Sequence, residues 1–230
     1  MKQRLIIISC ALALFACSSS EIKPDASLLG YDFFPLAKGQ YSIYQVSETS
    51  YLATGEVVND NYQLLEEIHD SFLTAEDSTY VIYRFRRNTS DDEWTFINTW
   101  QARRTPLQAI VIEGNTPFIK ISFPLKAGKV WNGNGLNTNE PDEYKMDSVY
   151  FSYINEADQQ FDNTVTVIQS DNQDFIVKQD KRFEIYAQNI GLVYARKLIL
   201  VYCSENDCLG QQLIDTGLDY SQTLIEYGEN

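Results

Sequence analysis

Residues that could do chemistry are few in this sequence. His69 is the single histidine, and Ser71 close to it lacks the Gly-x-Ser-x-Gly frame of a hydrolase nucleophile. Acidic residues form four groups that could supply the acid and base of a glycosidase or oxygen ligands for calcium: Glu76–Asp77, Asp91–Glu93, Glu140–Glu143 and Asp171–Asp174. Each group lies between expected strands, where solvated turns are rich in acidic residues, and none has EF-hand spacing. We therefore predict no catalytic residue, no metal site and no cofactor.

Two cysteines, Cys10 and Cys17, lie in the N-terminal stretch RLIIISCALALFACSSS. A short basic segment precedes an apolar run from Leu5 to Phe15, and small polar residues follow, which is the layout of an export signal. As a helix, about eleven residues rise roughly 16 Å, half the hydrocarbon thickness of a bilayer, so a permanent transmembrane helix is disfavoured. We predict that residues 1–16 are a signal peptide.

The residues Leu14–Cys17 resemble the lipobox of bacterial lipoproteins, although Phe15 is bulkier than the residue usual there. The resemblance implies that Cys17 is acylated, with a diacylglyceryl thioether and an N-acyl chain such as palmitate. Two or three acyl chains hold a protein firmly at a membrane. Because Ser18 follows and no Asp stands there, the resemblance also implies sorting to the outer membrane, with the leaflet left open. The alternative is an ordinary secretory signal cut between Ser18 and Ser20.

Cys203 and Cys208 are the two cysteines that remain, in the stretch CSENDCLG. An exported protein meets an oxidising compartment, and these two form an even count once Cys17 carries lipid. We predict a disulfide between them. Zinc is the rival interpretation, but a single histidine in the chain leaves too few ligands for it.

Composition limits the partners of the chain. Residues 17–30 contain Ser, Pro and Gly without any period and predict a flexible tether, and residues 31–230 are long enough for a single antiparallel β domain. The formal net charge is −14. Removal of residues 1–16 takes away Lys2 and Arg4, so the charge of the mature chain is about −16. Because binding phosphates requires a basic face, a nucleic-acid partner is disfavoured.

Period-two alternation dominates the chain after the tether. In STYVIYRFRR, for example, Val81, Tyr83 and Phe85 fall on one face. Residues 62–73 fit both a strand and a helix, and we favour the strand because their neighbours are strands. Residues 109–123 have the pattern of a β-hairpin. Further strands are expected over Gln40–Tyr51, Trp94–Arg103, Tyr144–Tyr153, Asn163–Ser170, Gly191–Cys203 and Leu213–Tyr227.

Two motifs resemble a group of mostly uncharacterised exported lipoproteins of Bacteroidota. One is PLxxG followed by aromatic residues, within FFPLAKGQYSIYQV at Pro35–Tyr44, and the other is ExYAxxxGLVY at Glu184–Tyr194. The resemblance implies an all-β fold, a single curved antiparallel sheet of half-barrel or lipocalin-like shape, and no known reaction. At most one or two short helices are expected. Asp77-Ser78-Thr79 and Asp147-Ser148-Val149 match the three-residue O-glycosylation pattern of exported Bacteroidota proteins, which leaves modification there open.

Two hypotheses for function follow. The first is a lipid-anchored, non-catalytic binding or assembly module whose concave sheet accepts a hydrophobic group, a glycan or an envelope protein. Aromatic residues make up 13% of the chain, and the candidate contacts are Trp94, Trp100 and Trp131. The alternative is an envelope hydrolase of glycan or ester type, which requires two carboxyl groups facing each other in one cleft about 5 to 10 Å apart.

Overall fold

The structure is a computed structural model that describes residues 29–74 and 78–230. The predicted signal peptide, Cys17, the tether up to residue 28 and the pair Glu76–Asp77 lie outside the described residues, so the interpretations placed there stay predictions. Within the described ranges, no helix has the length and apolar character needed to span a membrane.

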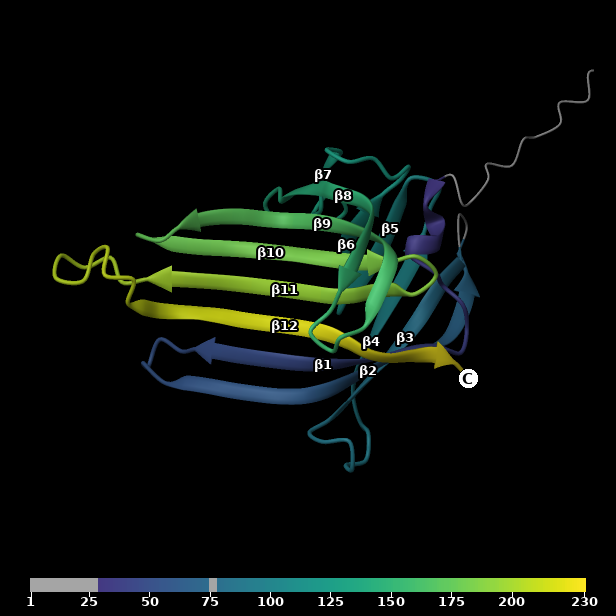
Figure 1. The fold of residues 1–230 in the computed structure, drawn as a ribbon, viewed down its shortest axis with the longest axis horizontal. Helices are drawn as coiled ribbons and strands as arrows, with labels where there is room; N and C mark the ends of the chain where they lie inside the picture. Colours follow the sequence, from purple (N-terminus) through teal and green to yellow (C-terminus); the bar gives the residue numbers. More distant parts are fainter. Residues whose placement is uncertain (1–28, 75–77) are drawn as a thin grey trace, which may run out of the picture.

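One antiparallel sheet of twelve strands makes up the fold, which confirms the predicted fold class (Figure 1). The strands follow the order β6-β5-β4-β3-β2-β1-β12-β11-β10-β9-β8-β7 across the sheet. Residues 62–73 lie within β2, so the strand interpretation is confirmed. The elements are the 3-10 helix η1 (Tyr31–Phe33) and the strands β1 (Gln40–Tyr51), β2 (Val57–Leu73), β3 (Ser78–Arg87), β4 (Thr95–Arg104), β5 (Gln108–Glu113), β6 (Thr116–Ser122), β7 (Val130–Asn132), β8 (Glu143–Ile154), β9 (Gln160–Asp174), β10 (Lys178–Ala187), β11 (Gly191–Tyr202) and β12 (Ile214–Glu229).

The sheet curls until its two edges meet, so that it is nearly closed into a barrel. The edge strands β6 and β7 do not form a ladder, but single hydrogen bonds join β6 to β7 and to Gly133, the residue that follows β7. The Ile119 N–H donates to the Gly133 carbonyl at 2.9 Å, and the Trp131 indole N–H donates to the Ile119 carbonyl at 2.9 Å. Closure places one face of every strand in a shared interior.

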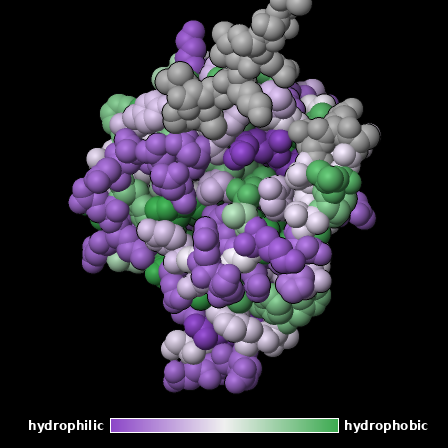
Figure 2. Space-filling view, turned by 90° about the vertical axis from the view of Figure 1, so that its right-hand side faces the viewer, coloured by the Kyte–Doolittle hydropathy of each residue, from purple (hydrophilic) through white to green (hydrophobic). Residues whose placement is uncertain are grey.

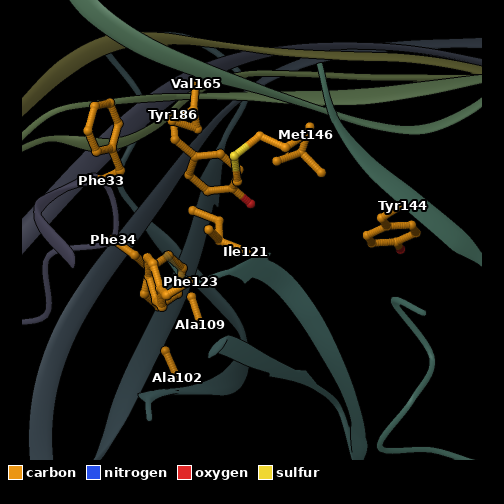
Figure 3. Packing of buried hydrophobic residues seen from close by; sticks show 11 residues of the cluster. Phe33, Phe34, Ala102, Ala109, Ile121, Phe123, Tyr144, Met146, Val165 and Tyr186 are labelled. Atoms are coloured by element: carbon orange, nitrogen blue, oxygen red, sulfur yellow. The ribbon is translucent and has the colours of Figure 1, made fainter. Parts of the chain in front are cut away.

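The segment around η1 crosses one end of this interior. The Arg104 guanidinium donates to the carbonyls of Tyr31 and Phe34, each at 3.0 Å, and the Asp32 carbonyl accepts from the Asn189 N–H at 2.7 Å. These bonds hold two aromatic rings inside the sheet, in an apolar cluster shown in Figure 3. Its buried members are Phe33, Phe34, Ala102, Ala109, Ile121, Phe123, Tyr144, Met146, Val165, Val167 and Tyr186.

The loop between β11 and β12 contains the predicted disulfide. Cys203 and Cys208 are bonded, with their Cα atoms 5.9 Å apart, so the predicted pairing is confirmed. Closing so short a loop stabilises the folded chain by about 2 kcal/mol in the chain-entropy account. The disulfide lies at the end of β11 opposite to η1, because Gly191 begins that strand beside the η1 segment and Tyr202 ends it.

Candidate functional site

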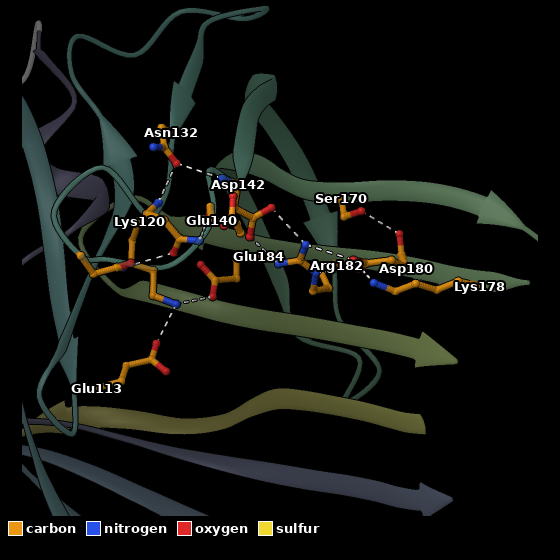
Figure 4. Close-up of polar contacts among 12 residues, drawn as sticks. Glu113, Lys120, Asn132, Glu140, Asp142, Ser170, Lys178, Asp180, Arg182 and Glu184 are labelled. Atoms are coloured by element: carbon orange, nitrogen blue, oxygen red, sulfur yellow. Dashed lines mark hydrogen bonds and ion pairs between the residues drawn. The ribbon is translucent and has the colours of Figure 1, made fainter. Parts of the chain in front are cut away.

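A buried ion cluster ties opposite walls of the interior together. Lys120 on β6 lies 2.9 Å from a carboxylate oxygen of Glu113 on β5 and 2.9 Å from one of Glu184 on β10 (Figure 4). The second oxygen of Glu184 accepts the Tyr186 hydroxyl at 2.5 Å. Because β10 is far from β6 in the order of the sheet, the Lys120–Glu184 contact spans the interior rather than two neighbouring strands.

All three groups in this cluster are charged at neutral pH. Burial opposes ionisation of Glu113 and Glu184, but the Lys120 ammonium outweighs it and holds the pKa of both carboxyls below the ordinary value. Burial likewise opposes the charge on Lys120, and the two carboxylates outweigh it and raise the pKa of the ammonium. This cluster of paired charges links β5 and β6 to β10 across the interior, and we call it the ionic crosslink below.

The two carboxyl groups lie close together, but they do not meet the protonation criterion of the hydrolase hypothesis. Their oxygens bind the same nitrogen at 2.9 Å each, so they are no further apart than twice that distance. A general acid must keep its proton at the working pH, which requires a raised pKa. Since the pKa of both Glu113 and Glu184 is lowered, the pair lacks a proton donor.

An apolar cavity of about 150 Å³ lies beside the ion cluster, at the end of the sheet that η1 crosses. Figure 2 views this end and shows apolar side chains at the base of a hollow with polar residues around it. Most of the wall is aliphatic or aromatic. The apolar lining includes Phe34, Leu36, Tyr44, Ile68, Ile82 and Trp100, and the charged lining is Glu66, Arg84, Glu113, Lys120, Glu184 and Lys197.

A second, polar cavity of about 270 Å³ adjoins the first, and Glu113, Lys120 and Lys197 line both. The remaining lining residues of this polar cavity are Phe118, Asn134, Asn139, Asp142, Tyr144, Gln169, Arg182 and Ile199. The Arg182 guanidinium is held by Asp142 at 2.8 Å and by Asp180 at 2.6 Å (Figure 4). Lys197 has no such partner: no hydrogen bond or ion pair to it is found among residues 29–74 and 78–230.

The three predicted tryptophan contacts have different surroundings. Trp100 on β4 lines the apolar cavity, where the Arg84 guanidinium covers its ring at 3.6 Å and pairs with Glu66 at 2.9 Å. Trp94 stacks under Arg87 at 4.2 Å, and Trp131 packs edge-on against a tyrosine at the seam of the sheet. Trp100 is thus the one of the three that lines either cavity described above.

The acidic groups singled out from the sequence do not come together. Asp91, Asp92, Glu140 and Asp171 are exposed on loops or strand ends, whereas Asp142 lines the polar cavity and pairs with Arg182. The carboxylates that share Lys120 are Glu113 and Glu184, neither of which belongs to those groups. His69 lies at a bulge of β2 with its side chain half exposed and stacks on the Tyr83 ring at 4.2 Å. In the described part of the chain, no three His, Cys, Asp or Glu side chains gather as metal ligands.

The two sequence motifs meet at the apolar cavity. The Tyr44 hydroxyl of the first motif donates to the Leu192 carbonyl of the second at 3.2 Å, and the Gln40 amide donates to the Ile190 carbonyl at 3.4 Å. Motif residues in the cavity wall are Pro35, Leu36, Tyr41, Tyr44, Glu184, Tyr186, Gly191 and Leu192. The motifs were therefore the sequence signal for this site, although their spacing gave no indication that they share a cavity.

Comparisons with known proteins give a limited result. No protein-family model and no curated protein matches the chain. Among solved structures, a protein described as exported, with a YmcC-like fold, from Bacteroides fragilis shares 12% identity at a TM-score of 0.45, covering 86% of this chain and 99% of its own. One described as a lipoprotein, from Parabacteroides distasonis, shares 11% identity at a TM-score of 0.41, covering 85% and 98%.

Proposed function

We propose that this protein is a lipid-anchored, non-catalytic binding protein of the bacterial cell envelope, attached to the outer membrane through Cys17. The observation that carries the binding activity is the apolar cavity at the end of the sheet that η1 crosses, with Trp100 in its wall. The lipobox resemblance at Leu14–Cys17 supports the anchor. Removal of Cys17 in the variant Cys17→Ala is expected to shift the protein out of the membrane fraction, whereas Cys10→Ala leaves it there.

The cavity favours a small hydrophobic group over the other ligands considered from the sequence. An interior cavity of about 150 Å³ with apolar walls is large enough for a molecule of the size of benzene. A glycan would need many free hydrogen-bonding side chains, but five of the six charged side chains in the wall are paired: Glu66 with Arg84, and Lys120 with Glu113 and Glu184. Lys197 is the exception. Binding therefore rests on apolar contact.

Toluene titration of a variant with a single tryptophan tests this function. In Trp94→Phe/Trp131→Phe, Trp100 is the remaining reporter, and saturable binding should change its emission. Ala195, which is 4% exposed and lines the cavity, provides the blocking variant Ala195→Leu. The exposed Ala53 provides the matched control Ala53→Leu. We expect binding in the parent and in the control, and its loss in Ala195→Leu with the fold intact by circular dichroism. Absence of saturable binding in the parent overturns the proposal.

A further inference from the structure

We infer, on the basis of the proposed function, that the ligand is an amphiphile: its apolar group fills the apolar cavity and its carboxylate head group lies in the polar cavity against Lys197, Tyr144 and Gln169. All three residues line the polar cavity. Each brings a polar group that the described residues leave without a hydrogen-bond partner.

Lys197 is the one cation in the walls of the two cavities that has no carboxylate partner among the described residues. Arg84, Lys120 and Arg182, the other cations in their walls, are each held by carboxylates at 2.6 to 2.9 Å. The Lys197 ammonium lies 5.8 Å from the centroid of the Tyr220 ring. Burial, together with the positive charge of Lys120, lowers the pKa of Lys197. An anion placed against this side chain would supply the charge partner that Glu113 and Glu184 already give to Lys120.

Tyr144 and Gln169 provide neutral donors beside this cation. Tyr144 is 4% exposed, and burial raises the pKa of its hydroxyl to about 12, so the hydroxyl keeps its proton and can donate. Gln169 is 3% exposed, and its side-chain nitrogen is buried without a hydrogen-bond partner. Leaving such a donor unpaired destabilises the fold, and an oxygen acceptor in the cavity would remove that cost.

A carboxylate fits this set of donors better than other head groups. Its two oxygens can accept from an ammonium, a hydroxyl and an amide together, whereas an alcohol oxygen has fewer acceptor positions. An amine would face Lys197 as a like charge. A phosphate monoester carries close to two negative charges at neutral pH. One lysine does not balance two such charges beside Glu113 and Glu184.

The shared wall allows one molecule to use both cavities. Glu113, Lys120 and Lys197 line each of them, so a head group against Lys197 in the polar cavity adjoins the aromatic and aliphatic wall around Trp100. In this arrangement the head group of the ligand occupies the polar cavity, and its apolar group occupies the apolar cavity.

Isothermal titration with three probes of equal length tests the inference: 3-phenylpropanoate, 3-phenylpropan-1-ol and 3-phenylpropan-1-amine. We expect the carboxylate to bind wild-type protein at least about tenfold more tightly than the alcohol, since hydrogen bonds to charged groups contribute that much. Lys197→Met should remove this preference, and Tyr144→Phe should weaken carboxylate binding about tenfold, since it removes one hydrogen bond to the charged head group. The control Lys145→Met, a lysine with a half-exposed side chain on β8, should leave the preference unchanged.

The outcomes separate this inference from the proposed function. Equal affinity for carboxylate and alcohol, or a preference that survives in Lys197→Met, overturns the head-group assignment while toluene binding still supports the cavity. Tighter binding of 3-phenylpropyl phosphate than of the carboxylate also overturns it. If neither toluene nor any of the phenylpropyl probes binds, the proposed function fails as well. Thermal unfolding of each variant establishes that the comparison is made between folded proteins.

Discussion

Lys120 and Lys197 line the same two cavities, yet their surroundings are opposite. Lys120 is bound by two carboxylates from two different strands, which raise its pKa, whereas Lys197 has no ion-pair partner among the described residues and its pKa is lowered. Lys120 therefore joins two strands of the fold, whereas Lys197 is the cation that we propose binds a ligand. The role of each lysine depends on which charged side chains the register of the strands places next to it.

Removal of Lys120 should have the largest effect on stability. Lys120→Met leaves Glu113 and Glu184 buried without their counter-ion and should lower the free energy of unfolding by about 3 to 5 kcal/mol in urea titration. The triple variant Lys120→Met/Glu113→Gln/Glu184→Gln also removes the two carboxylates that have lost their counter-ion, and it should recover part of that loss of stability. A triple variant no more stable than Lys120→Met would show that packing, not charge, explains the cost.

Acid should break the same ionic crosslink. The pKa of Glu113 and of Glu184 is lower in the folded protein than the ordinary value of 4.5, so their contribution is complete above that pH and is lost as the pH falls through the lowered values. Each unit of lowering corresponds to about 1.4 kcal/mol per carboxyl. Urea titrations between pH 7 and pH 3 should give a smaller drop for the triple variant than for wild type, and equal drops would contradict this account.

The two carboxylates of the ionic crosslink should not be equivalent. Glu184 is 4% exposed and also accepts the Tyr186 hydroxyl, whereas the side chain of Glu113 is 20% exposed. We expect Glu184→Gln to cost about 2 kcal/mol and Glu113→Gln about 1 kcal/mol, because hydrogen bonds to a buried charge contribute more. Chemical denaturation of the two single variants measures the difference, and the reverse order would mean that Tyr186 adds nothing.

Lys197→Met should change stability least. Lys197 has no ion pair to lose among the described residues, and its lowered pKa means that burial of its charge already costs stability at neutral pH. The free energy of unfolding should stay within about 0.5 kcal/mol of wild type or rise slightly. A loss as large as that of Lys120→Met would remove the contrast between the two lysines.

Much of the local structure followed from the sequence. Period-two alternation placed strands at Gln40–Tyr51 and Ser78–Arg87 with the bounds that the structure shows, and it favoured a strand over 62–73. The hairpin of β5 and β6 was also predicted. Alternation is a local signal, so it identifies strands but carries no information about which strands lie opposite each other across a closed sheet.

The candidate site was predicted only in part. Trp100 and the motif residues around Tyr44 and Tyr186 were singled out, and they line the apolar cavity. Glu113 and Lys120 entered the sequence analysis only as residues of the hairpin predicted over 109–123. Their roles depend on contacts across the interior: Lys120 and Glu184 are 64 residues apart in the chain.

The all-β class, most of the strands and the cysteine pair Cys203–Cys208 could be predicted from the sequence, because alternation and residue counts are local or compositional properties. Tertiary contacts were needed to show that the edges of the sheet meet, that Glu113 and Glu184 share Lys120, and that Lys197 has no ion-pair partner among the described residues. The physical reason is that curvature and register, set by the packing of all twelve strands together, choose which inward-facing charges come within reach of one another.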